Sequence, residues 1–299
     1  MTFLSDKTPA PYFEGCYFRH QSPSGDLLAL IPARHTDSAG RTTASLQVVT
    51  PRRTWTADFP GEAFLASRGV FQVWLDGNLL GQKGLRLDLR IPGLTLRGEV
   101  RYGPFTPLKS DIMGPFRFVP AMECRHGVVS MGHRLEGMLE LNGRTLDFNG
   151  GTGYIETDRG SSFPRAYLWT QCAWRESGNS SLMLSIAEIP FLGGRFTGCI
   201  CAVLHDGREY RLATYLGAQA VKWSAAGALI RQGSLLLAVE LLKGHAQALS
   251  APKEGRMERT IHESLRSTVR YRFWRGDALL FDHTDENASF EHADERSPL

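Results

Sequence analysis

Apolar and polar residues alternate along much of this chain, and this period of two is the feature that most limits its fold. In residues 85–91 the odd positions are leucine or isoleucine, and the even positions are arginine or aspartate. Residues 133–141, 182–188 and 269–273 follow a similar pattern. Successive side chains of a β-strand point to opposite faces, so each segment predicts a half-buried strand. No long segment has sustained helical periodicity, and we expect little helix.

Short turn sequences separate these segments. Asp76-Gly77, Asn142-Gly143 and Asp206-Gly207 are dipeptides typical of tight β-hairpins, and Arg275-Gly276-Asp277 predicts a further turn. Many strands at short spacing, joined by such turns, indicate a sandwich or a barrel. A chain of 299 residues is long enough for two of these units. We therefore expect an all-β fold of two β-barrel or sandwich units packed together.

A glycine cluster, Gly150-Gly151-Thr152-Gly153, is the natural boundary between the two units. We predict an N-terminal β domain over residues 1–149, a C-terminal β domain over residues 150–290, and a polar tail over residues 291–299. The glycines do not form a dinucleotide-binding loop, because the residues that follow them predict a strand rather than a helix. No phosphate-binding loop occurs either, and the sequence predicts no cofactor.

Composition excludes several classes of function. The net charge is +3 without a basic run, which argues against nucleic acid as a partner. The N-terminal residues do not read as a signal peptide, and no apolar stretch approaches the roughly 18–20 residues of a membrane-spanning helix. Five cysteines, an odd number, indicate free thiols in a reducing compartment, so we expect a cytoplasmic protein without a membrane span. The sequence does not indicate an oligomeric state.

The most unusual segment, residues 153–171, combines carboxylates, an arginine, a Phe-Pro pair and several aromatic residues. It resembles the signature of the tocopherol cyclase family, an acidic–Lys–Asn/Asp–Trp–Gly–x–x–Phe–Pro motif followed by an aromatic–x–Trp–x–Gln run. The matching residues are Glu156, Asp158, Gly160, Phe163, Pro164, Tyr167, Trp169 and Gln171. The opening Tyr12-Phe13-Glu14-Gly15 and the Met-Glu-Cys-x-His-Gly segment at residues 122–127 are also similar to the family. Thr157 stands where the motif has lysine, and Arg159 and Cys16 stand where it has tryptophan.

This resemblance implies two lipocalin-like units around a hydrophobic ligand. It also implies a cofactor-free cyclase or isomerase that acts on a prenylated or phenolic small molecule. Ring closure onto an alkene requires an acid, an acceptor for the phenol proton and a site that shields a developing cation. Aromatic faces stabilise such a cation. A carboxyl group in an apolar barrel is a plausible acid, because burial disfavours its anion.

The candidate catalytic residues are Glu156, Asp158, Glu188 and Gln171. Glu156 and Asp158 share one parity, and a strand would present them together. The alternative is that Asp158 and Arg159 form a structural charge cluster. Glu188 continues the apolar face of residues 182–186, so it faces the barrel interior unless the strand ends before Pro190, which would leave it at a wet rim.

We expect the substrate to contact aromatic residues and a few polar ones. Tyr167, Trp169 and Gln171 share a parity and would lie side by side on a strand. His133 lies on the apolar face of its strand, where a hydrogen-bonded core histidine is the alternative to a ligand contact. The predicted substrate-binding residues are Phe163, Tyr167, Trp169, His133, Arg159 and Tyr215. Cys199, Cys201 and His205 also share a parity, but no fourth ligand has suitable spacing, and we predict no metal site.

Two functions of different classes follow from this pattern. The first is a cyclase or isomerase that acts by acid–base catalysis in an apolar barrel. The second is a lipocalin-like carrier that binds a hydrophobic ligand without chemistry. The convergence of polar groups on the ligand distinguishes them. A structural interaction domain has less support, because the unusual residues gather around one segment.

Overall fold

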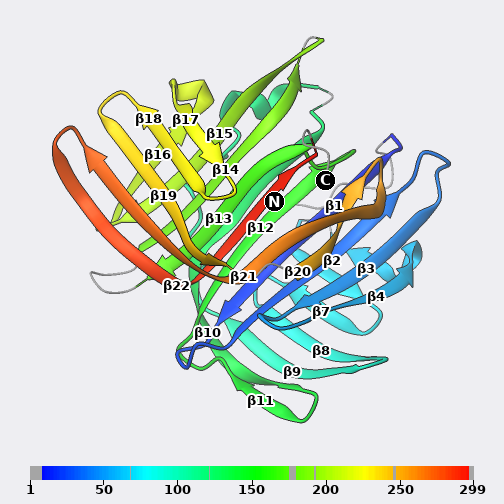
Figure 1. Ribbon diagram of the computed structural model, residues 1–299. Coiled ribbons are helices and arrows are strands. Elements are labelled where there is room, and N and C mark those ends of the chain that lie inside the picture. Colours follow the sequence, from blue (N-terminus) through cyan, green and yellow to red (C-terminus); the bar gives the residue numbers. More distant parts are fainter. Residues whose placement is uncertain are drawn as a thin grey trace. The chain divides into compact units, whose positions relative to one another are not determined.

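The computed structural model describes residues 9–67, 69–120, 122–174, 180–191, 193–244 and 247–295. Within these residues the regular structure is β-strand, apart from three short 3-10 helices, η1 (Gly61–Ala63), η2 (Gly114–Phe118) and η3 (Thr214–Leu216) (Figure 1). The predicted all-β fold with little helix is therefore confirmed. In this described part of the chain, no helix has the length and apolar character needed to cross a membrane.

The first sheet has 12 strands, in the order β4-β3-β2-β1-β12-β10-β9-β8-β7-β6-β5, with β11 paired to β10. Its strands are β1 (Tyr12–Gln21), β2 (Leu27–Thr36), β3 (Thr42–Val49), β4 (Thr54–Pro60), β5 (Phe64–Ala66), β6 (Gln72–Leu75), β7 (Asn78–Gly81), β8 (Gly84–Ile91), β9 (Leu94–Tyr102), β10 (Cys124–Leu141), β11 (Arg144–Asp147) and β12 (Thr152–Gly160).

The second sheet has 10 strands, in the order β16-β15-β14-β13-β22-β21-β19-β18-β17, with β20 paired to β21. Its strands are β13 (Ala166–Trp174), β14 (Ser180–Phe191), β15 (Gly194–His205), β16 (Arg208–Ala213), β17 (Gln219–Ser224), β18 (Gly227–Gln232), β19 (Leu235–Gly244), β20 (Gln247–Lys253), β21 (Arg256–Arg275) and β22 (Ala278–Asp294).

The two sheets have corresponding strand orders. Each starts with four strands joined in sequence, β1 to β4 and β13 to β16. In each, a strand late in the series, β12 or β22, returns to pair with the first, and the sheet continues from there through progressively earlier strands. Both sheets curl around their own apolar cores in the manner of lipocalin-like barrels.

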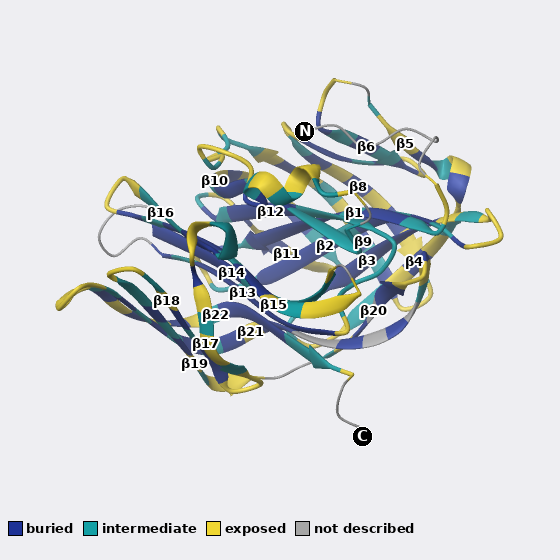
Figure 2. Cartoon of the chain, turned by 90° about the horizontal axis from the view of Figure 1, so that it is seen from above, coloured by how far each residue is buried: buried dark blue, intermediate teal, exposed yellow. Residues whose placement is uncertain are grey.

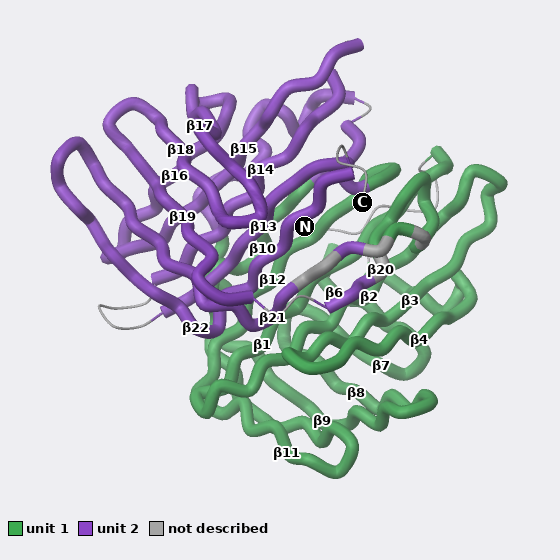
Figure 3. The backbone as a smooth tube through the Cα atoms, viewed as in Figure 1, with its two compact units in different colours: residues 1–107, 126–162, 251–259 green, residues 108–125, 163–250, 260–299 purple. Residues whose placement is uncertain are grey.

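Contacts between Cα atoms divide the chain into two compact units (Figure 3). Unit 1 comprises Met1–Pro107, His126–Ser162 and Ala251–Arg259, and unit 2 comprises Leu108–Arg125, Phe163–Ser250 and Thr260–Leu299. The chain therefore passes between the units several times, an arrangement that a single boundary at residues 149 and 150 does not describe. β12 follows that predicted boundary yet belongs to unit 1, because it pairs with β1 along its whole length.

The predicted polar tail also begins too early. Residues 291–294 complete β22, where Glu291 pairs with Trp169 and Asp294 pairs with Ala166. Backbone pairing to β13 holds this end of the chain in the second sheet, although its side chains are mostly polar. Residues 296–299 lie outside the described residues.

Alternating burial explains why the sequence forms these strands. In β8 the leucines are buried and the intervening Arg86, Asp88 and Arg90 are exposed. The leucines join the core of unit 1, and the corresponding apolar faces of β13, β14 and β15 build the core of unit 2. Figure 2 shows buried residues along the strands and exposed residues at many of the turns.

The predicted hairpin turns are present. Asp76-Gly77, Asn142-Gly143 and Asp206-Gly207 each connect two paired strands, and each residue of these dipeptides has a positive φ, between 47° and 82°. Two consecutive positive φ angles define the turn whose twist matches that of a hairpin, and asparagine, aspartate and glycine adopt them most readily.

Candidate functional site

The pairing of β1 with β12 in unit 1 separates two faces of the sheet. Cys16, Phe18 and Ile155 belong to the apolar core of unit 1. Because side chains alternate along a strand, Tyr17 and Glu156, which are opposite each other in the register, lie on the other face. Both are buried. Strand β12 therefore presents its even-numbered residues away from the unit 1 core.

A cluster of ionisable side chains occupies this second face. The imidazole of His126, from β10, lies between two carboxylates of β12. Its Nδ1 is 3.0 Å from Asp158 Oδ1, and its Nε2 is 3.4 Å from Glu156 Oε2. The hydroxyl of Tyr154 donates to Glu156 Oε2 at 2.5 Å. The side chains of His126, Glu156 and Asp158 are 10%, 6% and 22% exposed. We call His126, Glu156, Asp158 and Tyr154 the acid–base cluster.

The protonation of this cluster follows from its charges. Burial by itself lowers the pKa of His126, but the charges of Asp158 and Glu156, together with their hydrogen bonds, outweigh burial and raise that pKa well above its usual value. Burial, and then the charge of Glu156, raises the pKa of Tyr154, so its phenol keeps its proton and donates it in a hydrogen bond. The cluster therefore holds an imidazolium between two carboxyl groups near neutral pH.

The same side chains are the group of described residues best suited to hold a metal ion. One ligand atom from each of His126, Glu156 and Asp158 lies within 4.8 Å of the others. An imidazole ligates through one nitrogen, however, and here each ring nitrogen faces a different carboxylate. In the observed arrangement each ring nitrogen is placed to share a proton with the carboxylate that it faces.

The positions that differ from the tocopherol cyclase motif lie on the core face. Thr157 and Cys16 are directly opposite each other in the register of β12 and β1, and Arg159 is opposite Glu14. Arg159 therefore alternates away from Asp158, although the two are neighbours in the chain. The side chain of Asp158 contacts His126, at 3.0 Å.

His133 is also in unit 1, but in a different environment. Its ring lies 4.6 Å from Tyr102 and 4.9 Å from Phe105, measured between ring centroids. Its Nδ1 is 3.0 Å from the Ser130 hydroxyl. Burial, followed by the nearby His20, lowers the pKa of His133 to about 3. His133 is therefore a neutral, hydrogen-bonded histidine among aromatic rings, which matches the core alternative.

In unit 2, strand β13 brings three of the predicted residues to one face. Leu168 and Cys172 belong to the unit 2 core, so Tyr167, Trp169 and Gln171 lie on the opposite face of the strand. All three are buried. The Tyr167 hydroxyl donates to Glu291 of β22, and the ring of Phe163 meets the ring of Tyr167 edge to face, with centroids 6.0 Å apart. The predicted grouping of these side chains is therefore present.

Glu188 lies near the end of β14 and is bound by arginines. Its Oε2 is 2.5 Å from Arg165 Nε and 3.7 Å from Arg195 Nη1. Its side chain is 15% exposed. The apolar face of β14 does continue to this position, but the carboxylate is compensated by two cations, and such a group is a poor proton donor.

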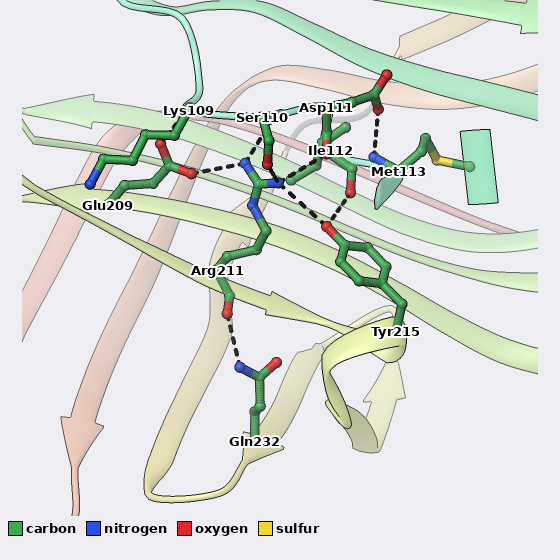
Figure 4. A network of polar contacts seen from close by, with 9 residues as sticks. All are labelled: Lys109, Ser110, Asp111, Ile112, Met113, Glu209, Arg211, Tyr215 and Gln232. Atoms are coloured by element: carbon green, nitrogen blue, oxygen red, sulfur yellow. Dashed lines mark hydrogen bonds and ion pairs between the residues drawn. The ribbon is translucent and has the colours of Figure 1, made fainter. Parts of the chain in front are cut away.

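Tyr215 does not lie with the other predicted ligand contacts. Its hydroxyl donates to the carbonyl of Ile112 at 2.9 Å, and its ring covers Gly114, where a Cβ would be 2.5 Å from the ring. Arg211 holds the same segment (Figure 4). The Arg211 guanidinium donates to Ser110 Oγ, Ser110 O, Asp111 O and Glu209 Oε1 at 2.7–2.9 Å. Tyr215 thus anchors residues 109–113 to β16 and η3.

Two residues of the acid–base cluster, His126 and Tyr154, were not among the sequence candidates. His126 is within the Met-Glu-Cys-x-His-Gly segment, whose likeness to the tocopherol cyclase family was a usable signal. Tyr154 shares the parity of Glu156 and Asp158, so alternation on one strand could also have found it.

Two solved structures have similar folds. One is a protein designated AttH from Nitrosomonas europaea, with a TM-score of 0.53 and 12% identity over 94% of this chain and 92% of that protein. The other is kievitone hydratase from Nectria haematococca, with a TM-score of 0.56 and 11% identity over 96% of this chain and 90% of that enzyme. No family model matches the chain. These likenesses establish the lipocalin-like fold.

Proposed function

We propose that this protein is a cofactor-free enzyme that adds a proton to a carbon–carbon double bond of a hydrophobic small molecule and directs an oxygen to the resulting cation. The acid–base cluster of unit 1 is the observation that carries this proposal. It supplies an imidazolium and two carboxyl groups within direct contact of one another, in a setting where water is largely excluded.

The charge of the cluster suits a cationic intermediate. The cluster combines one imidazolium with two acidic side chains, and burial makes the field of its charges stronger than in water. Such preorganised charge stabilises a developing carbocation. The aromatic rings of Tyr154 and of Tyr17, which is opposite Glu156 in the register, can add to this effect.

The reaction has two proton transfers. A proton held by His126 and shared with Glu156 or Asp158 moves to one alkene carbon, which leaves the cation on the other. An oxygen then bonds to the cationic carbon, and the proton of that oxygen returns to a carboxylate. If the oxygen is a hydroxyl of the substrate, a ring closes and the product is an isomer. If it is water, the product is an alcohol.

The comparisons and the sequence support these two outcomes. The likeness to kievitone hydratase supports hydration, and the resemblance to tocopherol cyclases supports ring closure of a prenylated phenol. Phe163, Tyr167, Trp169 and Gln171 belong to unit 2, and their roles there, as ligand contacts and for Gln171 in orienting a hydroxyl, stay predictions. We do not assign the acid to Glu188, because two arginines bind it.

The test is turnover of a panel of prenylated phenols in D2O, followed by mass spectrometry. After return to H2O we expect one deuterium to remain on carbon, so the product should be one mass unit heavier than its unlabelled form, which is an isomer of the substrate or the substrate plus one water. His126→Gln should abolish this incorporation. His283→Gln is the matched control, because His283 is a buried histidine of unit 2, stacked on Trp174 with ring centroids 4.4 Å apart, and outside the acid–base cluster.

The alternative is a carrier, and the same panel separates the two. Tight binding of the phenols with no product, for the wild type under all conditions, would support a carrier and contradict the enzyme. Full activity of a folded His126→Gln protein would contradict the assignment of the acid–base cluster.

A further inference from the structure

Unit 2 exposes a connected group of apolar side chains at one edge. Phe118, Phe191 and Leu216 are 73%, 42% and 51% exposed, large values for apolar side chains of this size. They come from three separate elements, η2, the end of β14 and η3. We call these three residues, with Phe116 and Phe196, the aromatic edge.

Ring contacts join the members of the aromatic edge. Phe196 of β15 stacks on Phe116 of η2 at 6.1 Å and meets Phe191 edge to face at 6.0 Å, measured between centroids. Phe116 also meets the ring of Tyr215, the residue before Leu216, at 6.2 Å. Ring contacts therefore join Phe116, Phe191 and Phe196 with Tyr215, and Phe118 and Leu216 follow this group in the chain, two residues after Phe116 and one after Tyr215.

The backbone beneath this patch is held in place. The hydrogen bonds of Arg211 and Tyr215 to residues 110–112 fix the chain just before η2 (Figure 4). The Tyr215 ring packs directly on Gly114. Gly114 has φ +52°, and an added Cβ would meet that ring at 2.5 Å. These contacts anchor the segment, so the exposed rings lie on an ordered backbone.

Arginines surround the patch. The guanidinium of Arg117 lies 4.4 Å from the centroid of the Phe118 ring. Arg195, next to Phe196, and Arg165 have side chains that are 36% and 44% exposed, and they share the single carboxylate of Glu188. Arg117 and Arg195 thus place positive charge directly beside Phe118 and Phe196 of the aromatic edge.

We infer that the aromatic edge docks unit 2 on an anionic lipid surface. Phenylalanine and leucine side chains enter the boundary between head groups and acyl chains, while arginines stay at the head groups and attract their negative charge. A second protein copy is a poorer fit. The three most exposed side chains offer roughly 300 Å² of apolar surface, whereas a stable interface buries about 800 Å² per partner. This inference goes beyond the proposed function and does not depend on it.

The experiment is flotation of the full chain with vesicles of two compositions, phosphatidylcholine alone and phosphatidylcholine with about 30% phosphatidylglycerol. We expect binding to the anionic vesicles that weakens with added salt. Phe118→Ser combined with Phe191→Ser should lower the partition coefficient at least about tenfold, and Arg117→Ser should lower it less, about two- to fivefold, and only on anionic vesicles.

Leu279→Ser is the matched control. Leu279 is the second residue of β22, and its exposed fraction, 51%, equals that of Leu216. It should bind vesicles like the wild type. No binding of the wild type to anionic vesicles would overturn the inference, as would an equal loss in the Leu279→Ser protein. Size-exclusion chromatography tests whether a second copy of the chain binds the aromatic edge instead. A wild-type dimer that the double substitution dissociates would contradict the lipid inference.

Discussion

In unit 1 the register of β1 and β12 places Tyr17 opposite Glu156, and in unit 2 the register of β13 and β22 places Trp169 opposite Glu291. Both glutamates are buried, and both accept a hydrogen bond from a tyrosine, Tyr154 or Tyr167. The two sheets, which have corresponding strand orders, therefore share one feature: an aromatic residue lies opposite a buried glutamate.

The surroundings of the two glutamates differ. In the part of the chain that the structure describes, three metal-ligand-type side chains come together only around Glu156, where His126 and Asp158 join it. The corresponding face of unit 2 presents Trp169 and the amide of Gln171. The comparison teaches that the shared fold supplies positions, while a few side chains on one strand face decide which unit gathers a histidine beside two carboxyl groups.

Replacing each buried glutamate by glutamine should produce the largest difference in activity between the two units. Glu156→Gln should lower kcat by about 10²- to 10⁴-fold, because the amide cannot exchange a proton with His126. Glu291→Gln should lower kcat much less, since the hydrogen bond it changes, from Tyr167, lies outside the acid–base cluster. Steady-state kinetics on a turned-over prenylated phenol gives both values. Equal losses of kcat in the two variants would show that both units take part in proton transfer.

Truncating one core residue in each unit tests whether the two cores are energetically equivalent. Phe18 and Phe273 are fully buried in the cores of unit 1 and unit 2. Phe18→Ala and Phe273→Ala should each cost about 3–5 kcal/mol, because each leaves a cavity that the strands cannot fully close. Hydrogen exchange should show faster opening mainly in the unit that carries the substitution. Uniform acceleration across both units would instead indicate one cooperative folding unit.

The hydrogen bonds of Arg211 are a feature of unit 2. They hold residues 109–113, which lie in the sequence between β9 and β10. Arg211→Met should destabilise residues 109–113 locally by about 1–3 kcal/mol, since it removes the hydrogen bonds of the guanidinium to Glu209 and to the carbonyls of Ser110 and Asp111. The amide of Lys109, which donates to Glu209 at 2.8 Å, reports this in hydrogen exchange. Arg270→Met, at a surface pair with Asp282, is the control and should leave that amide protected. Unchanged protection in Arg211→Met would disprove the anchor.

Histidine titration sharpens the comparison between the two faces of unit 1. Imidazole NMR signals should show His126 still protonated well above pH 6.5, because its pKa is raised. His20 and His133 should stay neutral down to about pH 5, because burial lowers their pKa values to about 4 and about 3. A neutral His126 at pH 7 would contradict the assigned charge of the acid–base cluster.

The same shifts give stability effects of opposite sign. A pKa that is raised on folding contributes stability below pH 6.5, and this contribution is lost as the pH rises through the folded-state value. The stability advantage of the wild type over His126→Gln should therefore shrink in alkali. For His20 the pKa is lowered on folding, so the unfolded chain binds a proton at a higher pH than the folded chain does. The free energy of unfolding therefore falls as the pH decreases from 6.5 towards about 4. Denaturation curves at several pH values measure both trends.

Local patterns in the sequence determined much of this protein. Alternation predicted the buried and exposed faces of β8, and dipeptides such as Asn142-Gly143 predicted the turns. Parity alone placed Glu156 with Asp158, and Tyr167 with Trp169 and Gln171. These predictions succeed because strand alternation and turn geometry depend on residues that are adjacent in the chain.

Only the tertiary structure decided the partners of those residues. It brought His126 to Asp158 across 32 positions of sequence by placing β10 beside β12, and it supplied Arg165 and Arg195 to Glu188. It also assigned β12 to unit 1 and residues 291–294 to β22. Strand pairing between distant segments sets these contacts, and a period of two is the same in every register, so it cannot specify which strands meet.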